Sequence, residues 1–158
     1  MVHAQLGIAE GNSGKLVSLI RSEARRIAEE REYSLIISDG SPGIGCPVIA
    51  SIAGATAVLV VTEPTVSGIH DLERVAELTG HFKIKTLVCI NKADINPENT
   101  KIIKQIALER KFIVVAEIPY DNIFTRAQMQ ALSVIEAGDG EAVSNIRTLW
   151  EAVKHEIM

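Results

Sequence analysis

Short apolar runs alternate with amphipathic stretches along this chain of 158 residues. Four of the runs are nearly continuous in Val, Ile and Leu, which is typical of strands buried on both faces of a parallel sheet. A fifth strand is predicted at the start of the chain. The predicted strands are Val2–Ile8, Ser34–Ser38, Ala57–Thr62, Lys85–Ile90 and Phe112–Glu117.

Apolar residues at helical spacing fill the intervals between these strands, and polar residues mark where the helices begin and end. Asn96 precedes Pro97, a pairing typical of a helix N-cap and first helical residue, and Asp121 is placed to cap a further helix. Gly80 is a predicted C-terminal stop. The predicted helices are Lys15–Arg31, the segment from Ser67 to Gly80, and those that begin near Asn96, Asp121 and Glu141.

The regular alternation of strand and helix predicts an α/β fold, with a doubly wound and mostly parallel sheet and helices on both faces. The length suits a single domain over residues 1–158. In such sheets, ligands bind in the crevice beyond the carboxyl ends of the strands. The motifs singled out below all follow predicted strands, which indicates a ligand site at that edge.

Composition narrows the range of functions. Aromatic residues make up 4% of the chain, and 16 Lys and Arg face 20 Asp and Glu, for a net charge of −4. We therefore expect no nucleic-acid partner, because neither a stacking platform nor a basic surface is indicated. No apolar run approaches the roughly 20 residues of a membrane helix. Two cysteines, Cys46 and Cys89, suit a reducing compartment, and we expect a cytoplasmic protein.

The most informative loop follows Ser34–Ser38 and reads D-G-S-P-G-I-G from Asp39. A carboxylate at a strand end can hold Mg²⁺ directly or through water, as a metal–phosphate site requires. Gly43 would let a backbone N–H approach a terminal phosphate, and Pro42 restricts the loop. The same residue types also form ordinary tight turns, so the alternative is a turn without a ligand.

Two further loops follow predicted strands. The N-K-A-D run from Asn91 can present an amide to a purine edge, lay the Lys92 stem along the ring and accept from ring N–H groups through Asp94. The I-P-Y-D run, which contains Pro119 and Asp121, could form the other wall of a base pocket. In the alternative, these polar residues only cap helices and close turns.

A glycine-containing loop precedes the first predicted helix. Its residues are Gly11, Asn12, Ser13, Gly14 and Lys15. The loop departs from the phosphate-loop pattern G-x-x-x-x-G-K-[ST], because Ala9 replaces the first glycine and Leu16 replaces the hydroxyl residue that binds Mg²⁺. It can bind an anion weakly at the helix start, and its simpler role is to cap that helix.

The D-G-S-P-G-I-G, T-E-P-T, N-K-A-D and I-P-Y-D motifs occur in the order and spacing of one known family. Together they resemble the C-terminal portion of MinD/ParA-type P-loop ATPases, in the branch with an inserted ferredoxin-like iron–sulfur domain. The resemblance covers essentially the whole chain. It implies a P-loop NTPase-like fold that here lacks the phosphate-loop strand, with ATP and Mg²⁺ as ligands.

The resemblance also implies roles for individual residues. Asp39 matches the acid near Mg²⁺, Asn91 matches the residue expected to contact adenine, and Pro119 and Asp121 match the loop that closes the base pocket. The switch loop that senses the γ-phosphate is matched by Gly40, Ser41, Pro42 and Gly43. The family hydrolyses ATP as a dimer with the nucleotide at the interface. The resemblance thus implies a homodimer through the nucleotide face, and a redox or cluster-assembly protein as partner.

Two parts of the family pattern are missing. The glycine-rich phosphate loop and the cysteine runs of the inserted domain normally precede the motifs described above. We therefore expect a C-terminal fragment that binds ATP poorly and hydrolyses it negligibly by itself. Iron–sulfur clusters are expected in the missing part. Because the missing strand is central in the family's sheet, we also expect an unpaired sheet edge or a groove.

The two cysteines lead to different expectations. Cys46 follows Asp39 by seven residues, the separation between the switch Asp and an interfacial cluster ligand in the related nitrogenase iron protein. The resemblance thus offers Cys46 as a ligand of a cluster shared between subunits, the alternative being a small buried thiol. Cys89 lies within an apolar strand and is expected in the core.

Two functions from other classes are also open at this point. The chain could be a non-enzymatic interaction module that keeps the fold without the phosphate loop. It could also be a guanine-nucleotide switch that reads its base through the N-K-A-D loop. A preference for GTP over ATP would decide for the second.

Overall fold

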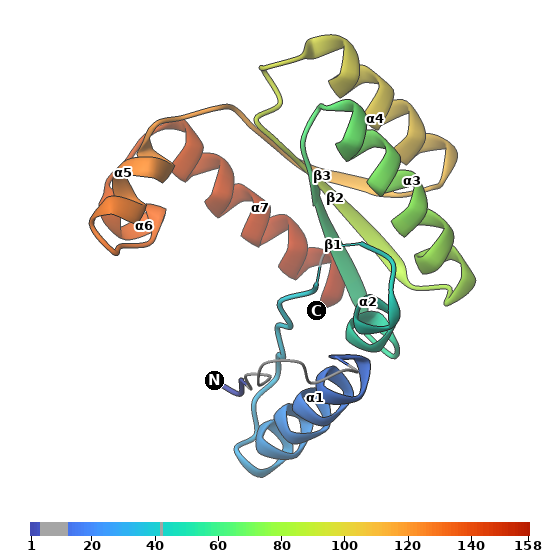
Figure 1. The fold of residues 1–158 in the computed structure, drawn as a ribbon. Helices are drawn as coiled ribbons and strands as arrows, with labels where there is room; N and C mark the ends of the chain where they lie inside the picture. The colour runs from blue at the N-terminus through green and yellow to red at the C-terminus, as the bar shows by residue number, and fades with distance from the viewer. Residues whose placement is uncertain (4–12, 42) are drawn as a thin grey trace. The chain divides into compact units, whose positions relative to one another are not determined.

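The structure is a computed structural model that describes residues 1–3, 13–41 and 43–158. The chain divides into two compact units, Met1–Ala55 and Thr56–Met158, and each is described by itself (Figure 1). Within the described residues, no helix is long and apolar enough to cross a membrane. The expectation of a single domain stays a prediction.

The unit Thr56–Met158 is built on three parallel strands in the order β1-β2-β3. The strands are β1 (Ala57–Thr62), β2 (Lys85–Asn91) and β3 (Ile113–Ile118). Helices α3 (Val66–His81) and α4 (Pro97–Glu109) form the crossovers between them. The predicted bounds of β1 are confirmed, and those of β2 and β3 are within one residue of the prediction.

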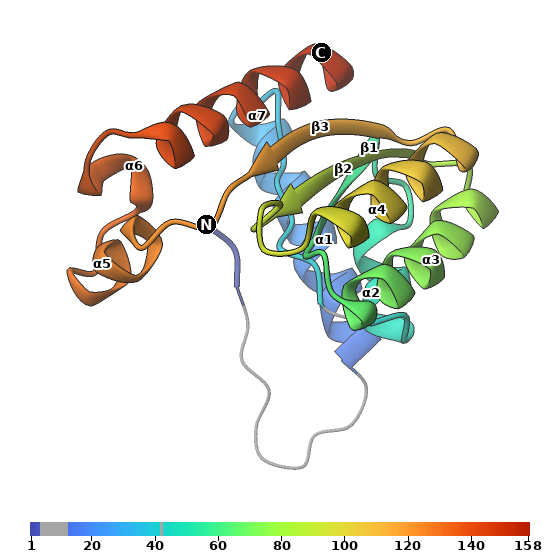
Figure 2. The same cartoon turned by 90° about the horizontal axis from the view of Figure 1, so that it is seen from above.

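Helices cover both faces of this sheet (Figure 2). On one face, α3 and α4 bury Leu72 and Ile103 against Val88 and Ile90 of the central strand. On the other face, α7 (Glu141–Ile157) packs its start against Cys89 and Ile118, with Ala142 and Val143 fully or almost fully buried. The predicted parallel α/β sheet with helices on both faces is therefore confirmed.

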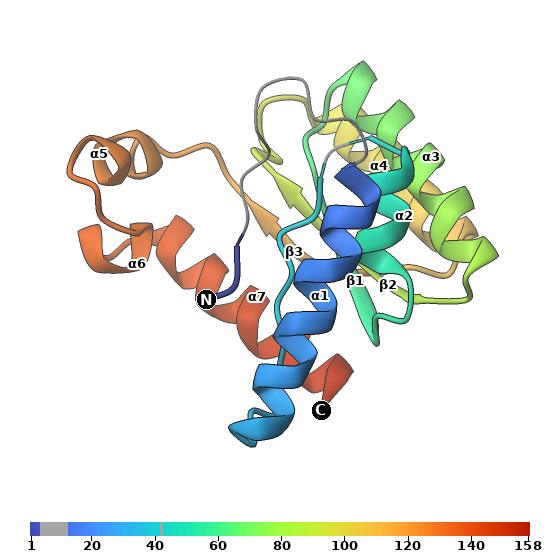
Figure 3. The same cartoon turned by 60° about the horizontal axis from the view of Figure 1, so that its bottom comes forward.

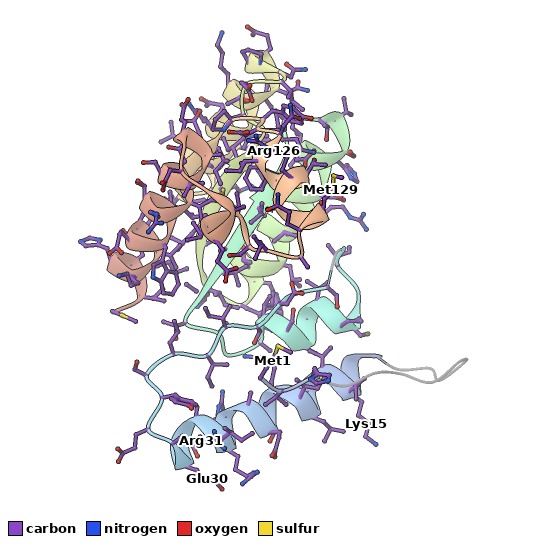
Figure 4. The ribbon with its side chains drawn as sticks, turned by 90° about the vertical axis from the view of Figure 1, so that its left-hand side faces the viewer. Met1, Lys15, Glu30, Arg31, Arg126 and Met129 are labelled. Atoms are coloured by element: carbon purple, nitrogen blue, oxygen red, sulfur yellow. The ribbon has the colours of Figure 1, made fainter. Side chains whose placement is uncertain are left out.

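Two short helices, α5 (Ile123–Met129) and α6 (Val134–Ala137), connect β3 to α7. Ser133 and Glu136 form a reciprocal capping box at the start of α6. Arg126 and Met129, labelled in Figure 4, are exposed residues of α5. The sequence pattern predicted α5 but not α6, because four residues are too few to show helical periodicity.

The unit Met1–Ala55 contains α1 (Ser13–Glu30) and α2 (Cys46–Ile52), which lie side by side (Figure 3). Arg21 of α1 ends the shorter helix by donating from Nη1 to the carbonyl oxygens of Ala50 and Ala53, at 2.8 and 2.6 Å. Burial, aided by the nearby Arg25, lowers the pKa of Arg21. The sequence pattern did not predict α2, since its seven residues follow directly on a glycine-rich loop.

Two strands were predicted in this unit, and neither is found among the described residues. The predicted strand Ser34–Ser38 is wrong, because the segment pairs with no strand among the described residues and Ile36 and Ile37 are exposed. An apolar run becomes a strand only when a partner takes up its backbone hydrogen bonds. The predicted strand Val2–Ile8 lies largely outside the described residues, and its first two positions are not in a strand.

The apolar runs predict strands that are buried on both faces, and only the central strand, β2, meets this prediction. Thr86–Ile90 of β2 are buried, whereas Leu59 and Val61 of β1 are 38% and 60% exposed. Strand β1 has no further neighbour on its outer side among the described residues. This agrees with the expectation of an unpaired sheet edge.

Two helices of the sheet unit, α3 and α4, end at left-handed residues that are not glycine. Helix α3 runs one residue past Gly80, and the left-handed position belongs to Lys83, with φ of +54°. Hydrogen bonds from Ile84 N to Thr79 O and from Lys83 N to Gly80 O complete a Schellman motif. The prediction of Gly80 as the stop is therefore wrong, and Lys111 has the same left-handed role after α4.

Candidate functional site

Three loops meet at the carboxyl edge of the sheet in Thr56–Met158, because parallel strands end on the same side. The Ala93 N–H donates to the carbonyl of Ile118 at 2.9 Å, which joins the β2 loop to the end of β3. Asn99 Nδ2 donates to the carbonyl of Pro64 at 3.1 Å, which joins the start of α4 to the β1 loop. The edge is thus one connected surface built from residues that are far apart in the sequence.

Glu63 lies at the centre of this connection. Its Oε1 is 2.8 Å from Lys92 Nζ and 3.4 Å from Asn91 Nδ2. Glu63 and Lys92 are each a little more than one-third exposed, and Asn91 is half-buried. A charged pair so placed is only partly screened by solvent, and it links the T-E-P-T and N-K-A-D motifs.

Lys92 has an unusual backbone conformation. Its φ is +53°, in the left-handed region that a side chain with a Cβ enters at a cost of about 1–2 kcal/mol. The Ile95 N–H donates to the Lys92 carbonyl, and Thr100 Oγ1 donates to the Ala93 carbonyl at 2.7 Å. These bonds hold the turn in place. Lys83 and Lys111 have the same conformation at helix ends, so what distinguishes the N-K-A-D turn is its place at the carboxyl edge of the sheet, where ligands bind in folds of this kind.

Both predicted acids of the edge bind backbone N–H groups. Asp94 Oδ1 accepts from Tyr120 N at 2.6 Å, and Asp121 Oδ1 accepts from Ile123 N at 2.8 Å. Asp121 therefore helps to start α5, although Asn122 is the residue at the N-cap position. The same bonds bring the predicted residues Asn91, Lys92, Asp94, Pro119 and Asp121 into neighbouring loops of one edge.

The β1 loop contains residues to which the sequence patterns assigned no role. Thr65 caps α3, since its Oγ1 accepts from Gly68 N at 3.0 Å. A Cβ on Gly68 would lie 2.3 Å from the Glu63 carbonyl oxygen, so only glycine fits there. Pro64 is fully buried. The sequence held a signal for Glu63, because it directly follows the strand that ends at Thr62.

The other predicted loop lies in Met1–Ala55. Asp39, Gly40 and Ser41 are exposed, Gly43 has a φ of +89°, and Pro42 lies outside the described residues. Within the described parts of the chain, no three His, Cys, Asp or Glu side chains are grouped as metal ligands. A single carboxylate still suits Mg²⁺, which is commonly held by one or two carboxylates, phosphate oxygens and water.

The glycine-containing loop is described only in part. Gly11 and Asn12 lie outside the described residues, while Ser13, Gly14 and Lys15 form the first turn of α1, where Lys15 is exposed (Figure 4). Gly14 is buried, and a Cβ there would lie 3.1 Å from Cys46 Cβ. The small residue at position 14 therefore lets the starts of α1 and α2 come together, whatever else the loop does.

The two cysteines differ in their exposure to solvent. Cys46, the first residue of α2, is exposed, so the alternative interpretation of a buried thiol is wrong. The cluster-ligand hypothesis for Cys46 stays a prediction. Cys89 is fully buried in β2, as predicted, and burial raises the pKa of its thiol to about 11.

Comparison with known proteins bears on the fold. No protein-family model matches the sequence. Among curated proteins, the uncharacterized protein MJ0578 of Methanocaldococcus jannaschii is 28% identical over 158 residues, which are 99% of this chain and 51% of that protein. This chain thus spans about half the length of that relative.

Solved structures of MinD cell-division ATPases are similar over most of the chain. MinD of Aquifex aeolicus, solved alone and in a MinC:MinD complex, is 20% identical with a TM-score of 0.71, over 92% of this chain and 62% and 60% of those chains. MinD of Pyrococcus horikoshii, complexed with Mg-ADP, is 15% identical with a TM-score of 0.69, over 89% of this chain and 56% of that chain. The chain has an α/β P-loop NTPase-like fold.

In terms of this P-loop NTPase-like fold, the candidate residues fall into two sets. Asn91 ends β2, Lys92–Asp94 follow it, and Pro119–Asp121 follow β3. Hydrogen bonds join these two loops. Asp39–Gly43 precede α2 in the other unit. The fold by itself assigns a ligand to neither set.

Proposed function

We propose that this chain is part of a MinD-like nucleotide switch that binds ATP with Mg²⁺. The observation that carries the proposal is the clamp between the β2 and β3 loops, in which Ala93 N bonds to Ile118 O and Tyr120 N bonds to Asp94 Oδ1. It holds two loops at the ligand-binding edge of a parallel sheet. The solved MinD complex with Mg-ADP supports this choice of ligand.

In this proposal the base lies against the N-K-A-D and I-P-Y-D loops. Asn91 contacts the adenine, the Lys92 stem lies along the ring, and Pro119 with Asp121 closes the pocket. Adenine is taken as the base because the similar MinD structure from Pyrococcus horikoshii holds Mg-ADP. Asp94 Oδ1 accepts from Tyr120 N at 2.6 Å, which holds the two loops of the pocket together.

Within Met1–Ala55, the Asp39 loop is proposed as a site for Mg²⁺ and phosphate. Asp39 would hold Mg²⁺, and backbone N–H groups of Gly40, Ser41 and Gly43 would meet the γ-phosphate, while Pro42, which has no N–H to donate, would restrict the loop. The bound metal neutralises charge on the phosphates. The positive φ of Gly43 suits a backbone that approaches a ligand closely. Since positioning and charge drive phosphoryl transfer, this assignment requires no general base from the chain.

The complete protein is proposed to be larger than this chain. Because the chain spans 51% of MJ0578, the remaining half has room for the phosphate loop and for a domain with iron–sulfur clusters. Without that half, weak ATP binding and negligible hydrolysis are expected. The complete protein would form a homodimer through its nucleotide face and act on a redox or cluster-assembly partner. Cys46 is a proposed cluster ligand, and Gly11–Lys15 a secondary anion loop.

Titration of the isotopically labelled chain with Mg-ATP, followed by amide NMR, tests the base site. We expect the signals of Asn91–Asp94 and Tyr120 to move together at millimolar nucleotide. Asn91→Ala should weaken binding several-fold, the worth of one hydrogen bond. Asn145→Ala is the matched control, because Asn145 lies on α7 and bonds to the Glu117 carbonyl. Absence of any shift at these loops would contradict the proposal and favour an interaction module.

A further inference from the structure

The Glu63 carboxylate reaches from the β1 loop to the residue proposed to read the base. Its Oε1 lies 2.8 Å from Lys92 Nζ and 3.4 Å from Asn91 Nδ2. The second distance is long for a hydrogen bond, yet it decides how the Asn91 amide is turned. A carboxylate oxygen can only accept, so the NH₂ group of the amide faces it. The reverse orientation would bring Asn91 Oδ1 against a negatively charged oxygen.

Glu63 is itself held firmly enough to act on Asn91. The Thr65 N–H donates to the Glu63 carbonyl at 2.8 Å, and Pro64 beside it is fully buried. Gly68 packs against the same carbonyl, where no larger residue fits. The root of the Glu63 side chain is therefore fixed, and its tip is fixed by Lys92.

With its NH₂ group turned to Glu63, Asn91 presents its oxygen to whatever binds beside it. We propose that Glu63 is a positioning residue that makes the site selective for adenine over guanine. At position 6 of the purine, adenine has an amino group that donates, whereas guanine has a carbonyl oxygen that accepts. Asn91 Oδ1 can accept from the first and repels the second. The inference rests on the proposed function, whose base site it deepens.

Substitution of Glu63 by glutamine tests this role. The amide of Glu63→Gln can donate as well as accept, so it no longer dictates which way the Asn91 amide faces. We expect the affinity ratio for Mg-ATP over Mg-GTP, measured by NMR titration of the full 158-residue chain, to fall about three- to tenfold. Glu117→Gln is the matched control, since it breaks the Lys104–Glu117 pair at 2.6 Å and leaves Asn91 untouched.

A second variant keeps the test decisive if glutamine disturbs the loop. Glu63→Asp retains the charge but withdraws the carboxylate by one methylene, and it should lower the same ratio. A merely structural role would weaken both nucleotides equally and leave the ratio unchanged. An unchanged ratio in both variants overturns the inference alone. A wild-type chain that prefers GTP overturns the inference together with the adenine assignment of the proposed function. A wild-type chain that binds neither nucleotide overturns the proposed function, and the inference with it.

Discussion

Gly68 and the carbonyl oxygen of Glu63 approach so closely that a Cβ at position 68 would lie 2.3 Å from that oxygen and 3.0 Å from Thr62 Oγ1. Both neighbours are fixed, since the Thr65 N–H binds the carbonyl and Thr62 Oγ1 donates to the Gly68 carbonyl. Gly68→Ala should therefore destabilise the fold by about 2 kcal/mol, the cost of forcing a backbone shift. Urea unfolding followed by the fluorescence of Trp150, the single tryptophan, measures this.

Gly80→Ala in the same helix is the matched control. A Cβ at position 80 meets nothing within 4 Å, so alanine should raise the free energy of unfolding by about 0.5–1 kcal/mol, as helix propensity predicts. The two substitutions are chemically identical and should have opposite signs. A Gly68→Ala variant as stable as the wild type would contradict the close approach.

Lys83 and Lys111 offer sites for stabilisation. Both are left-handed, with φ of +54° and +60°, and both follow helices that end in Schellman hydrogen bonds. Glycine removes a strain of about 1–2 kcal/mol and adds unfolded-state entropy worth about 0.5–1 kcal/mol. Lys83→Gly and Lys111→Gly should each gain about 0.5–1 kcal/mol in urea unfolding. Lys101→Gly, on an exposed face of α4, should instead lose about 1 kcal/mol.

The two cysteines should react at very different rates. Cys46 is exposed at the start of α2, whereas Cys89 is fully buried and its pKa is raised to about 11. Since the thiolate is the nucleophile, iodoacetamide at pH 8 should label Cys46 and spare Cys89 in the folded chain. Peptide mass spectrometry separates the two sites, and both should react in concentrated urea. Equal labelling rates without urea would contradict the burial of Cys89.

Burial of Cys89 also predicts a dependence of stability on pH. Its folded pKa of about 11 lies above the ordinary thiol value of 9.0. Between these values the unfolded chain releases a proton that the folded chain keeps, so the free energy of unfolding falls as pH rises. The loss approaches roughly 2 kcal/mol near pH 11. Urea unfolding should show that the difference in free energy of unfolding between the wild type and Cys89→Ala becomes smaller from pH 7 to 10.5. A difference that stays constant over this range would contradict the link between thiol ionisation and stability.

Arg21 should be required for the short helix that follows the Asp39 loop. Its Nη1 donates to the carbonyls of Ala50 and Ala53 at the end of α2. Charged hydrogen bonds of this kind contribute about 1.5 kcal/mol or more. Arg21→Met should speed amide hydrogen exchange in α2 at least about tenfold. Arg25→Met, which removes an exposed arginine of the same helix, should leave that exchange unchanged.

Some of the fold could be predicted because its causes are local. Each predicted strand and helix has its pattern within one continuous segment of the chain. This holds for the apolar runs of β1, β2 and β3 and for the helical spacing of α1, α3, α4 and α7. The Asn96 cap is equally local, since its side chain accepts from Asn99 N within one turn. Apolar residues repeat every two positions in strands and every 3.6 positions in helices, and turn preferences involve only neighbouring residues. A single sequence is therefore enough to show all three signals.

What the sequence alone determined about this protein is thus an alternating α/β chain with polar loops at its strand ends. Only the tertiary structure decided that Ser34–Ser38 stays unpaired, that Lys83 rather than Gly80 takes the left-handed position, and that Glu63 reaches Asn91 across 28 residues of chain. The physical reason is the same in each case. Strand partners, helix ends and loop contacts depend on groups brought together by the sheet register, and no local pattern specifies which groups those will be.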